Sequence, residues 1–193
     1  MIDSAMDEDV ELISRRRVLD DFLKVDEATV RVGGEVQRRL SLERGDSVAA
    51  VVERREDGAI LLTRQFRYPT MAKGPGYLLE LPAGTVEDDE DPVDALRREL
   101  VEELGFEADR IEPIATIYVS PGGSSERVLL YATEVGAADR VGDGGGLRSE
   151  GEAIEIVAVS IDDLLAMVAD GTIADAKTII GALWLERRRA GGT

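Results

Sequence analysis

Residues 84–106 read GTVEDDEDPVDALRRELVEELGF, and this stretch decides the fold of the chain. Asp91 stands where a helix N-cap belongs, and Pro92 follows it at the first helical position. Gly105 comes just after the last apolar residue of the periodic run, where glycine commonly ends a helix. The stretch therefore predicts an α-helix over residues 92–104.

At about 100° per residue, this predicted helix has one apolar face and one acidic face. Glu99, Glu102 and Glu103 share the acidic face. Glu99 and Glu103 are like-charged i, i+4 neighbours, which costs an isolated helix about 0.2–0.5 kcal/mol, and the macrodipole disfavours anions near the helix C-terminus. A divalent cation would reverse both penalties, because carboxylate oxygens are the ligands of Mg²⁺ and Mn²⁺. Viewed alone, the same face is also typical of a solvated acidic surface.

The residues that flank the helix complete a pattern of fixed spacing, G-x5-E-x7-R-E-(aliphatic)-x-E-E-x-G-(apolar). Its members are Gly84, Glu90, Arg98, Glu99, Leu100, Glu102, Glu103, Gly105 and Phe106. This pattern is the complete Nudix box, so the chain resembles the Nudix hydrolases. The resemblance implies the Nudix fold, which is an α/β/α sandwich with a mixed sheet, and a metal-dependent hydrolase.

Each part of the box has a physical role. Gly84 is expected to allow a sharp turn after the preceding strand, which brings the backbone carbonyl of Ala83 near the carboxylates. Glu90 and Arg98 are suited to form an ion pair that fixes the loop against the helix. We therefore expect a site for Mg²⁺, with Mn²⁺ as the alternative. The expected ligands are Ala83, Glu99, Glu102, Glu103 and Glu152.

The composition excludes several other chemistries. The 193 residues contain no His and no Cys, which excludes a Ser-His-Asp triad, a thiol nucleophile, a disulfide and a His/Cys zinc site. The net charge of −17 argues against a nucleic-acid partner, because most of the surface repels phosphates. No apolar stretch approaches the length of a membrane span and the N-terminus is acidic, so we expect a cytoplasmic protein without a membrane partner.

The chain is expected to divide into three parts. Residues 1–10 are acidic and lack periodicity, which indicates a disordered tail. Residues 11–45 hold short alternating segments broken at Asp20–Asp21 and at Gly33–Gly34, which predicts a small antiparallel β extension. Residues 46–193 are expected to form the Nudix domain. Because the extension is too small to bury its own apolar side chains, and resembles the one that related enzymes exchange between subunits, we expect a homodimer.

The third part is expected to alternate between strands and helices. The strands are predicted at residues 47–52, 59–66, 77–84, 112–119, 127–134 and 153–160. Two further helices are predicted from Ser160 to Gly171 and over residues 176–189. The last helix is expected to bury Ile179, Ile180, Leu183 and Trp184, and the glycine run Gly142–Gly146 to form a flexible loop.

Two segments outside the box resemble the branch of the family that hydrolyses ADP-ribose and nucleoside diphosphate sugars. They are RQFRYP, residues 64–69, and SPGGSSE, residues 120–126. The resemblance implies a small-molecule substrate, either ADP-ribose or a related nucleoside diphosphate sugar such as GDP-mannose. Where the ADP-ribose enzymes carry Arg-Glu, this chain has Arg39 followed by Leu40, which removes a carboxylate that could bind a purine. The implied substrate-binding residues are Arg39, Arg64, Arg67 and Gly123.

The implied catalytic set consists of Arg98, Glu99, Glu103 and a general base. Glu126 ends the SPGGSSE loop, and the matching loop of ADP-ribose pyrophosphatases carries the proposed base, so Glu126 is the candidate. Glu150 and Glu152 are its rivals, as base or as a further metal ligand. A non-catalytic ADP-ribose sensor is a different class of function, but such a module would be expected to have lost box glutamates.

Overall fold

The computed structural model describes residues 9–147 and 152–191. By its internal contacts the chain divides into two units. The N-terminal unit consists of residues 1–45 together with the segment Tyr118–Glu126, and the sandwich unit consists of residues 46–117 and 127–193. Within the described ranges, no helix has the length and apolar character that crossing a membrane requires.

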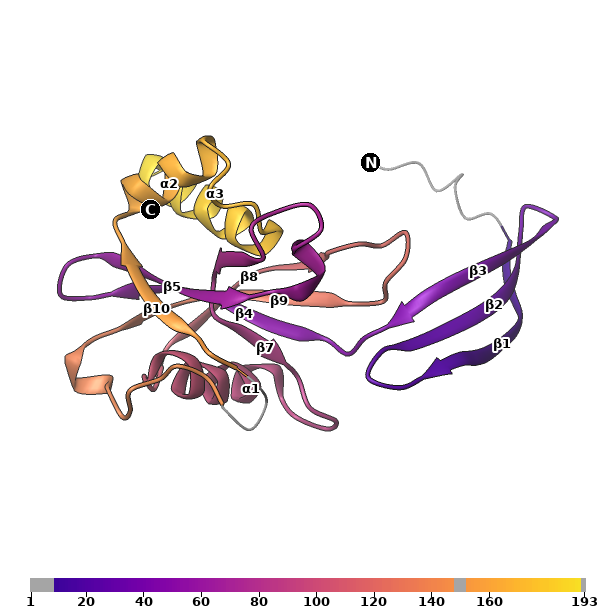
Figure 1. Cartoon of the computed structure of the whole chain (residues 1–193), viewed down its shortest axis with the longest axis horizontal. Coiled ribbons are helices and arrows are strands. Elements are labelled where there is room, and N and C mark those ends of the chain that lie inside the picture. Colours follow the sequence, from indigo (N-terminus) through magenta and orange to yellow (C-terminus); the bar gives the residue numbers. More distant parts are fainter. Residues whose placement is uncertain (1–8, 148–151, 192–193) are drawn as a thin grey trace. The chain divides into compact units, whose positions relative to one another are not determined.

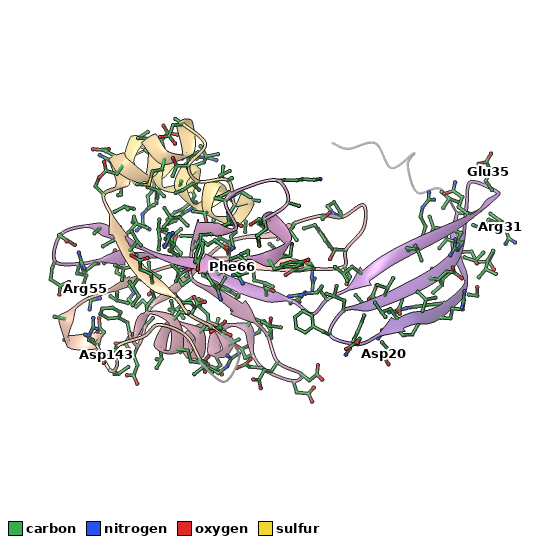
Figure 2. All side chains as sticks on the ribbon, viewed as in Figure 1. Asp20, Arg31, Glu35, Arg55, Phe66 and Asp143 are labelled. Atoms are coloured by element: carbon green, nitrogen blue, oxygen red, sulfur yellow. The ribbon has the colours of Figure 1, made fainter. Side chains whose placement is uncertain are left out.

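The N-terminal unit is a three-stranded antiparallel sheet in the order β1-β2-β3 (Figure 1). Gly33 and Gly34 both have φ in the left-handed region, as a tight hairpin turn needs. Arg31 and Glu35 stand on either side of this turn (Figure 2). The predicted breaks therefore separate its strands, which are β1 (Val10–Asp20), β2 (Lys24–Val32) and β3 (Glu35–Glu43).

Ion pairs across the strands hold one face of this sheet. Asp26 of β2 is buried, and it accepts hydrogen bonds from both Arg15 and Arg17 of β1. Arg15 also lies 3.2 Å from a carboxylate oxygen of Glu43 in β3, so the pairs connect all three strands. Cross-strand pairs of opposite charge stabilise a sheet that has little apolar core of its own.

The sandwich unit is built on a seven-stranded mixed sheet in which β10, β5, β4, β9 and β8 lie in that order. β4 and β9 run parallel, whereas β5 pairs with β10 and with β6 in antiparallel fashion, and β7 pairs with β4. Its strands are β4 (Ser47–Arg54), β5 (Ala59–Phe66), β6 (Tyr77–Glu80), β7 (Ala83–Thr85), β8 (Ile111–Tyr118), β9 (Arg127–Val135) and β10 (Glu155–Val159).

Helices cover both faces of this sheet (Figure 1). On one face, α1 (Pro92–Glu99) continues into a π-helical turn, η3 (Leu100–Leu104). On the other face lie α2 (Ile161–Ala169) and α3 (Ala176–Gly191). Two short 3₁₀ turns, Tyr68–Thr70 and Ala137–Asp139, complete the unit in the described ranges.

Strand β4 shows why the sheet has two covered faces. Val48, Ala50 and Val52 belong to the apolar cluster with α1 and η3. Ala49 and Val51 belong to the opposite cluster, with α2 and α3. Successive side chains of a strand point to opposite faces, so an unbroken apolar run such as SVAAVV fits only a strand buried on both sides. The predicted α/β/α sandwich with a mixed sheet is confirmed.

Two local predictions are wrong. The strand predicted over residues 77–84 is split into β6 and β7, which pair with different neighbours. At the break, the N–H of Leu81 donates to Oγ1 of Thr178 at 2.9 Å, and Pro82 has no N–H to donate to a strand. Leu183 is half exposed instead of buried, because it lies on the outer side of α3.

Candidate active site

The acidic residues of the box lie where α1 passes into η3. The carboxylate of Asp91 caps α1 as predicted, accepting the N–H of Val93 at 2.8 Å. Over Leu100–Leu104 the helix widens to a π-helical turn, a feature often found at functional sites. Gly105 then ends the helix with a left-handed φ of 78°. The predicted bounds of the helix are confirmed, but its last turn is wider than an α-helical one.

Glu103 is a deeply buried carboxylate in this turn. The residue is 2% exposed, and its Oε2 accepts the N–H of Ala83 at 3.0 Å. Burial raises the pKa of Glu103 to about 8, and the negative charges of Glu99 and Glu152 act in the same direction. A cation at this position would favour the ionised carboxylate and remove the repulsion between these groups.

Glu99 packs directly over the backbone of Gly84. A Cβ on Gly84 would lie 1.8 Å from the carboxyl carbon of Glu99, so any side chain there would have to displace that carboxylate. Gly84 stands in the extended strand β7 and not in a sharp turn, so glycine is required here for space. Burial raises the pKa of Glu99, and the charges of Glu102 and Glu152 add to the effect against the opposing influence of Arg98.

Arg98 connects the box loop to the carboxylates. Its Nε and Nη2 each bond a carboxylate oxygen of Glu90 at 3.1 Å, so the predicted ion pair is present. Its Nη1 bonds Glu99 at 2.7 Å, and Nη2 also bonds the carbonyl of Thr85 at 3.1 Å. Arg98 therefore orients Glu99, and we describe it as a positioning residue.

The charge of Glu152, in the C-terminal part of the chain, acts on the same carboxylates. Its Oε2 accepts the N–H of Leu147 at 3.0 Å, and its charge raises the pKa of both Glu99 and Glu103. Glu152 thus joins the box glutamates although it is remote from them in sequence. Glu150, its rival as the base, lies outside the described residues.

The glycine loop Gly142–Gly146 is packed against the end of η3. The N–H groups of Gly145 and Gly146 donate to the carbonyls of Glu103 and Glu102, at 2.8 and 3.0 Å. These carbonyls belong to the last helical turn and have no partner within the helix. The loop that was expected to be flexible therefore provides hydrogen-bond donors for the last carbonyls of the helix that carries the glutamates.

Arg67 is held by a buried carboxylate that the sequence patterns did not single out. Glu80, the last residue of β6, accepts Nε of Arg67 at 3.0 Å and Nη2 at 3.3 Å. Lys177 of α3 donates to the same carboxylate at 2.5 Å and lies 3.1 Å from Asp175. Burial alone would raise the pKa of Glu80, but Lys177 and Arg67 more than offset it and hold the pKa below its usual value. The available signals were an acid within the apolar stretch YLLEL and a lysine within an apolar helix.

We expect Glu80→Gln to lower the free energy of unfolding by about 3 kcal/mol near pH 7, since one partner of a buried ion cluster is removed. The difference from wild type should shrink below about pH 5. The pKa of Glu80 is lower in the folded protein than in the unfolded chain, so its contribution is complete above the unfolded value and is lost as the folded carboxylate is protonated. Urea unfolding of both proteins at several pH values measures this. A pH-independent difference would contradict it.

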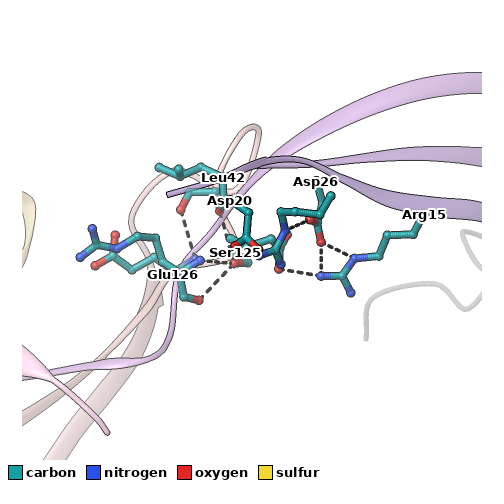
Figure 3. A network of polar contacts seen from close by, with 10 residues as sticks. Arg15, Asp20, Asp26, Leu42, Ser125 and Glu126 are labelled. Atoms are coloured by element: carbon teal, nitrogen blue, oxygen red, sulfur yellow. Dashed lines mark hydrogen bonds and ion pairs between the residues drawn. The ribbon is translucent and has the colours of Figure 1, made fainter. Parts of the chain in front are cut away.

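Glu126 and Gly123 belong to the N-terminal unit, in the segment Tyr118–Glu126. This segment pairs with the end of β3, where the N–H of Leu42 donates to the carbonyl of Gly123 at 2.8 Å. The N–H of Ser125 donates back to the carbonyl of Leu42 at 3.0 Å (Figure 3). A Cβ on Gly123 would meet no atom within 4 Å, so space is open beside it.

The two remaining predicted residues have other partners. Arg39 lies on the exposed side of β3 and donates to the side chain of Gln37. Arg64 lies on β5, 3.1 Å from a carboxylate oxygen of Glu155, and its guanidinium stands 4.6 Å over the ring of Tyr77. The predicted site residues that the sandwich unit brings together are Arg67, Ala83, Arg98, Glu99, Glu102, Glu103 and Glu152.

These residues suit a hard divalent cation. The donors are carboxylate oxygens that repel one another, and Gly84 leaves a space that Glu99 fills. Among the described residues, no three such side chains already converge on one point. Instead, Arg98 holds Glu99 and the N–H of Ala83 holds Glu103. The donor chemistry fits Mg²⁺ or Mn²⁺, and a bound ion would compete with these hydrogen bonds.

A cavity of about 570 Å³ lies elsewhere in the sandwich unit. Its walls include Glu53 of β4, Thr133 of β9 and Trp184 of α3. None of the predicted site residues lines it, and its walls carry charges of both signs. The cavity is therefore separate from the box carboxylates.

Comparison with known proteins gives the same family as the box. A GDP-mannose pyrophosphatase of Yersinia pestis (strain Pestoides F) is 39% identical over 160 residues, covering 82% of this chain and 77% of that protein. A GDP-mannose pyrophosphatase of Pectobacterium atrosepticum is 39% identical over 151 residues, covering 77% of each. The crystal structure of an ADP compounds hydrolase shares the fold, with a TM-score of 0.77 and 17% identity over 95% of each chain. Residues 43–180 match the NUDIX domain model, and with the complete box they show that the chain belongs to the Nudix family.

Proposed function

We propose that this Nudix protein is a pyrophosphohydrolase that cleaves the diphosphate of a nucleoside diphosphate sugar. The observation that carries the proposal is the placement of Arg67 within the electrostatic reach of the buried carboxylate Glu103 and the partly buried Glu152. Hydrolysis of a diphosphate needs carboxylates that bind cations and an arginine that binds phosphate oxygens. One water is consumed, and the products are a nucleoside monophosphate and a sugar phosphate.

We assign Mg²⁺, with Mn²⁺ as the alternative, to the carboxylates and to the carbonyl of Ala83. When bound, such a cation neutralises the diphosphate and lowers the pKa of a water that attacks phosphorus in line. Arg98 keeps Glu99 oriented, and Gly84 leaves room for it. The proposed ligands are Ala83, Glu99, Glu102, Glu103 and Glu152.

We assign substrate contacts to the arginines and to the open loop position. Arg67 would bind the diphosphate, and Arg64 and Arg39 would bind other parts of the nucleotide, since guanidinium groups bind phosphate oxygens bidentately and stack on bases. Gly123 leaves space for the ligand beside the loop. We assign to Glu126 the role of general base, which accepts a proton from the attacking water. A carboxylate that binds no metal is a stronger base than one that does.

Two substrates follow from these comparisons and from the sequence. ADP-ribose is favoured by the SPGGSSE loop, whereas the relatives named above are GDP-mannose pyrophosphatases, and Leu40 in place of an acid fits a change of base. Sugar nucleotides are cytoplasmic metabolites, and we place the protein in the cytoplasm with them.

The test is a substrate panel with product identification, run with Mg²⁺ and then with Mn²⁺. We expect kcat/KM for ADP-ribose or GDP-mannose to exceed that for any nucleoside triphosphate, and EDTA to abolish turnover. A nucleoside triphosphate as the best substrate would show that the branch of the family is wrong. Turnover that persists in EDTA would overturn the metal assignment.

We also propose that the protein is a homodimer that associates through the N-terminal unit. Its sheet leaves large apolar side chains exposed, among them Leu40 and Val36 of β3, which are 51% and 60% exposed. In the register, they lie opposite Glu27 and Arg31 and so share one face of the sheet. On this face Val36 and Leu40 flank Arg38, which is ion-paired with Glu27. Large apolar side chains exposed on a sheet this small favour burial against a second copy.

Sedimentation equilibrium should give twice the chain mass of 20.9 kDa for the wild type. Val36→Asp combined with Leu40→Asp should yield monomers, because both charges would be buried in the interface. Leu183→Asp is the matched control, since Leu183 is 50% exposed but lies on α3 in the sandwich unit. A double variant that sediments like the wild type would contradict the assignment of the interface.

A further inference from the structure

The carboxylate of Glu80 lies between two cations inside the sandwich unit. Its residue is 3% exposed. Arg67 donates to it through Nε at 3.0 Å and through Nη2 at 3.3 Å, and Lys177 donates to it through Nζ at 2.5 Å. The three side chains come from the residue that follows β5, the end of β6 and the start of α3.

We propose that Glu80, together with Lys177, is a positioning residue that holds the guanidinium of Arg67 for the diphosphate of the substrate. The inference rests on the proposed function and deepens it, because it names the groups that orient the phosphate-binding arginine. Glu80 itself acts only through Arg67 and has no contact with the substrate.

The geometry of the guanidinium supports this role. Arginine carries five N–H donors in a planar group. Glu80 accepts hydrogen bonds from Nε and from one N–H of Nη2, along one edge of the guanidinium group. The two donors on Nη1 and the second donor on Nη2 remain, and a planar set of this kind matches the oxygens of a phosphate group.

Lys177 keeps Arg67 attractive to an anion. An isolated Arg–Glu pair is neutral, and a buried carboxylate would cancel most of the positive potential of its arginine. Here the charge of Glu80 is shared with Lys177, which lies closer to it than Arg67 does. Lys177 also lies 3.1 Å from Asp175, so only part of its charge acts on Glu80. That part leaves Arg67 more positive potential for a polyanionic ligand than an isolated Arg–Glu pair would have.

The backbone after Glu80 ties this arginine to the carboxylates of the box. Leu81 donates its N–H to Thr178 at the start of α3, and two residues later Ala83 donates its N–H to Glu103. The charges of Glu103 and Arg67 also affect each other directly. One short stretch of chain thus fixes both the arginine and a proposed metal ligand, which sets the phosphate group at a defined distance from the place of cleavage.

The test is steady-state kinetics of Glu80→Gln, with calorimetric titration of inorganic pyrophosphate in Mg²⁺ as a readout independent of turnover. We expect KM for the preferred sugar nucleotide and Kd for pyrophosphate to rise about ten- to hundred-fold, with a smaller change in kcat, as loss of a charge-assisted contact would cause. Asp57→Asn is the matched control, because Asp57 holds Arg54 in the same side-on geometry, at 2.9 and 2.6 Å, in a turn away from the box. It should leave both constants unchanged.

A double-mutant cycle separates positioning from a general structural role. In the background of Arg67→Ala, Glu80→Gln should cause no further rise in KM, since there is no arginine left to orient. Additive effects, or an unchanged Kd for pyrophosphate, would overturn the proposal. Should Glu80→Gln fail to fold, Lys177→Gln takes its place, and a smaller rise of both constants is expected. Failure of the wild type to hydrolyse any sugar nucleotide would contradict the proposed function, while the pyrophosphate titration would still decide the positioning role.

Discussion

Glu103→Gln should yield a folded protein whose kcat is lower by at least about 10³-fold, the scale of losing electrostatic stabilisation of a transition state. Glutamine has one oxygen and no charge, so it cannot hold a divalent cation as a carboxylate does. Its oxygen can still accept the N–H of Ala83, which Glu103 accepts at 3.0 Å. The variant should therefore lose the metal and keep the local structure.

Unfolding in EDTA provides the second readout for this variant. Burial raises the pKa of Glu103 to about 8, so a charge at this position costs the metal-free protein stability, and removing it should not lower the free energy of unfolding. Glu107→Gln is the control, since Glu107 is exposed just beyond the end of η3. Full activity of Glu103→Gln would contradict its role as a metal ligand, and failure of the variant to fold would show that Glu103 is a structural residue.

Glu126→Gln should lower kcat by about 10²–10⁴-fold, the usual share of general acid–base catalysis, and leave the affinity for the metal nearly unchanged. Glu126 ends a segment that is joined to β3 by backbone hydrogen bonds between Leu42, Gly123 and Ser125, and the substitution leaves these bonds in place. The measurements are kcat and a titration with Mn²⁺. Glu134→Gln is the control, because Glu134 is exposed at the other end of β9.

Glu152→Gln tests the rival assignment, in which Glu152 and not Glu126 is the general base. Glu152 affects the pKa of both Glu99 and Glu103, as a further metal ligand would, so its loss should weaken metal affinity. If Glu126→Gln is nearly as active as the wild type while Glu152→Gln is inactive with its metal affinity intact, the base is Glu152.

The elements predicted from the sequence are those whose signals are local. Asp91, Pro92 and Gly105 mark the ends of the box helix through their own backbone chemistry, so its bounds could be predicted. The split between β6 and β7 could not, because the N–H of Leu81 is taken by Thr178, which is 97 residues away along the chain. Alternation of apolar residues reports burial and does not report which strand is the neighbour.

Within the candidate site, too, only the residues with a local sequence signal could be predicted. The box fixes the spacing of Arg98, Glu99 and Glu103, so a short motif was enough to single them out. Glu80 and Lys177 are joined only in the folded chain, and the apolar sequence around each indicates burial but not its partner. The π-helical form of η3 was also beyond prediction, since the glycine loop whose N–H groups donate to the carbonyls at its end lies far along the chain.

The two glycines at the ends of the box are required for different reasons, and they would fail in different ways. Gly105 has a left-handed φ, and a Cβ there would lie 2.3 Å from the carbonyl oxygen of Gly142, so a substitution strains the backbone itself. Gly84 has a backbone that any residue adopts, and the atoms nearest to an added Cβ belong to the carboxylate of Glu99, which a side chain there would displace. In evolutionary terms, one substitution at Gly84 would turn an enzyme into a receptor that binds the substrate without cleaving it. Such a descendant would keep its fold and its arginines and lose turnover.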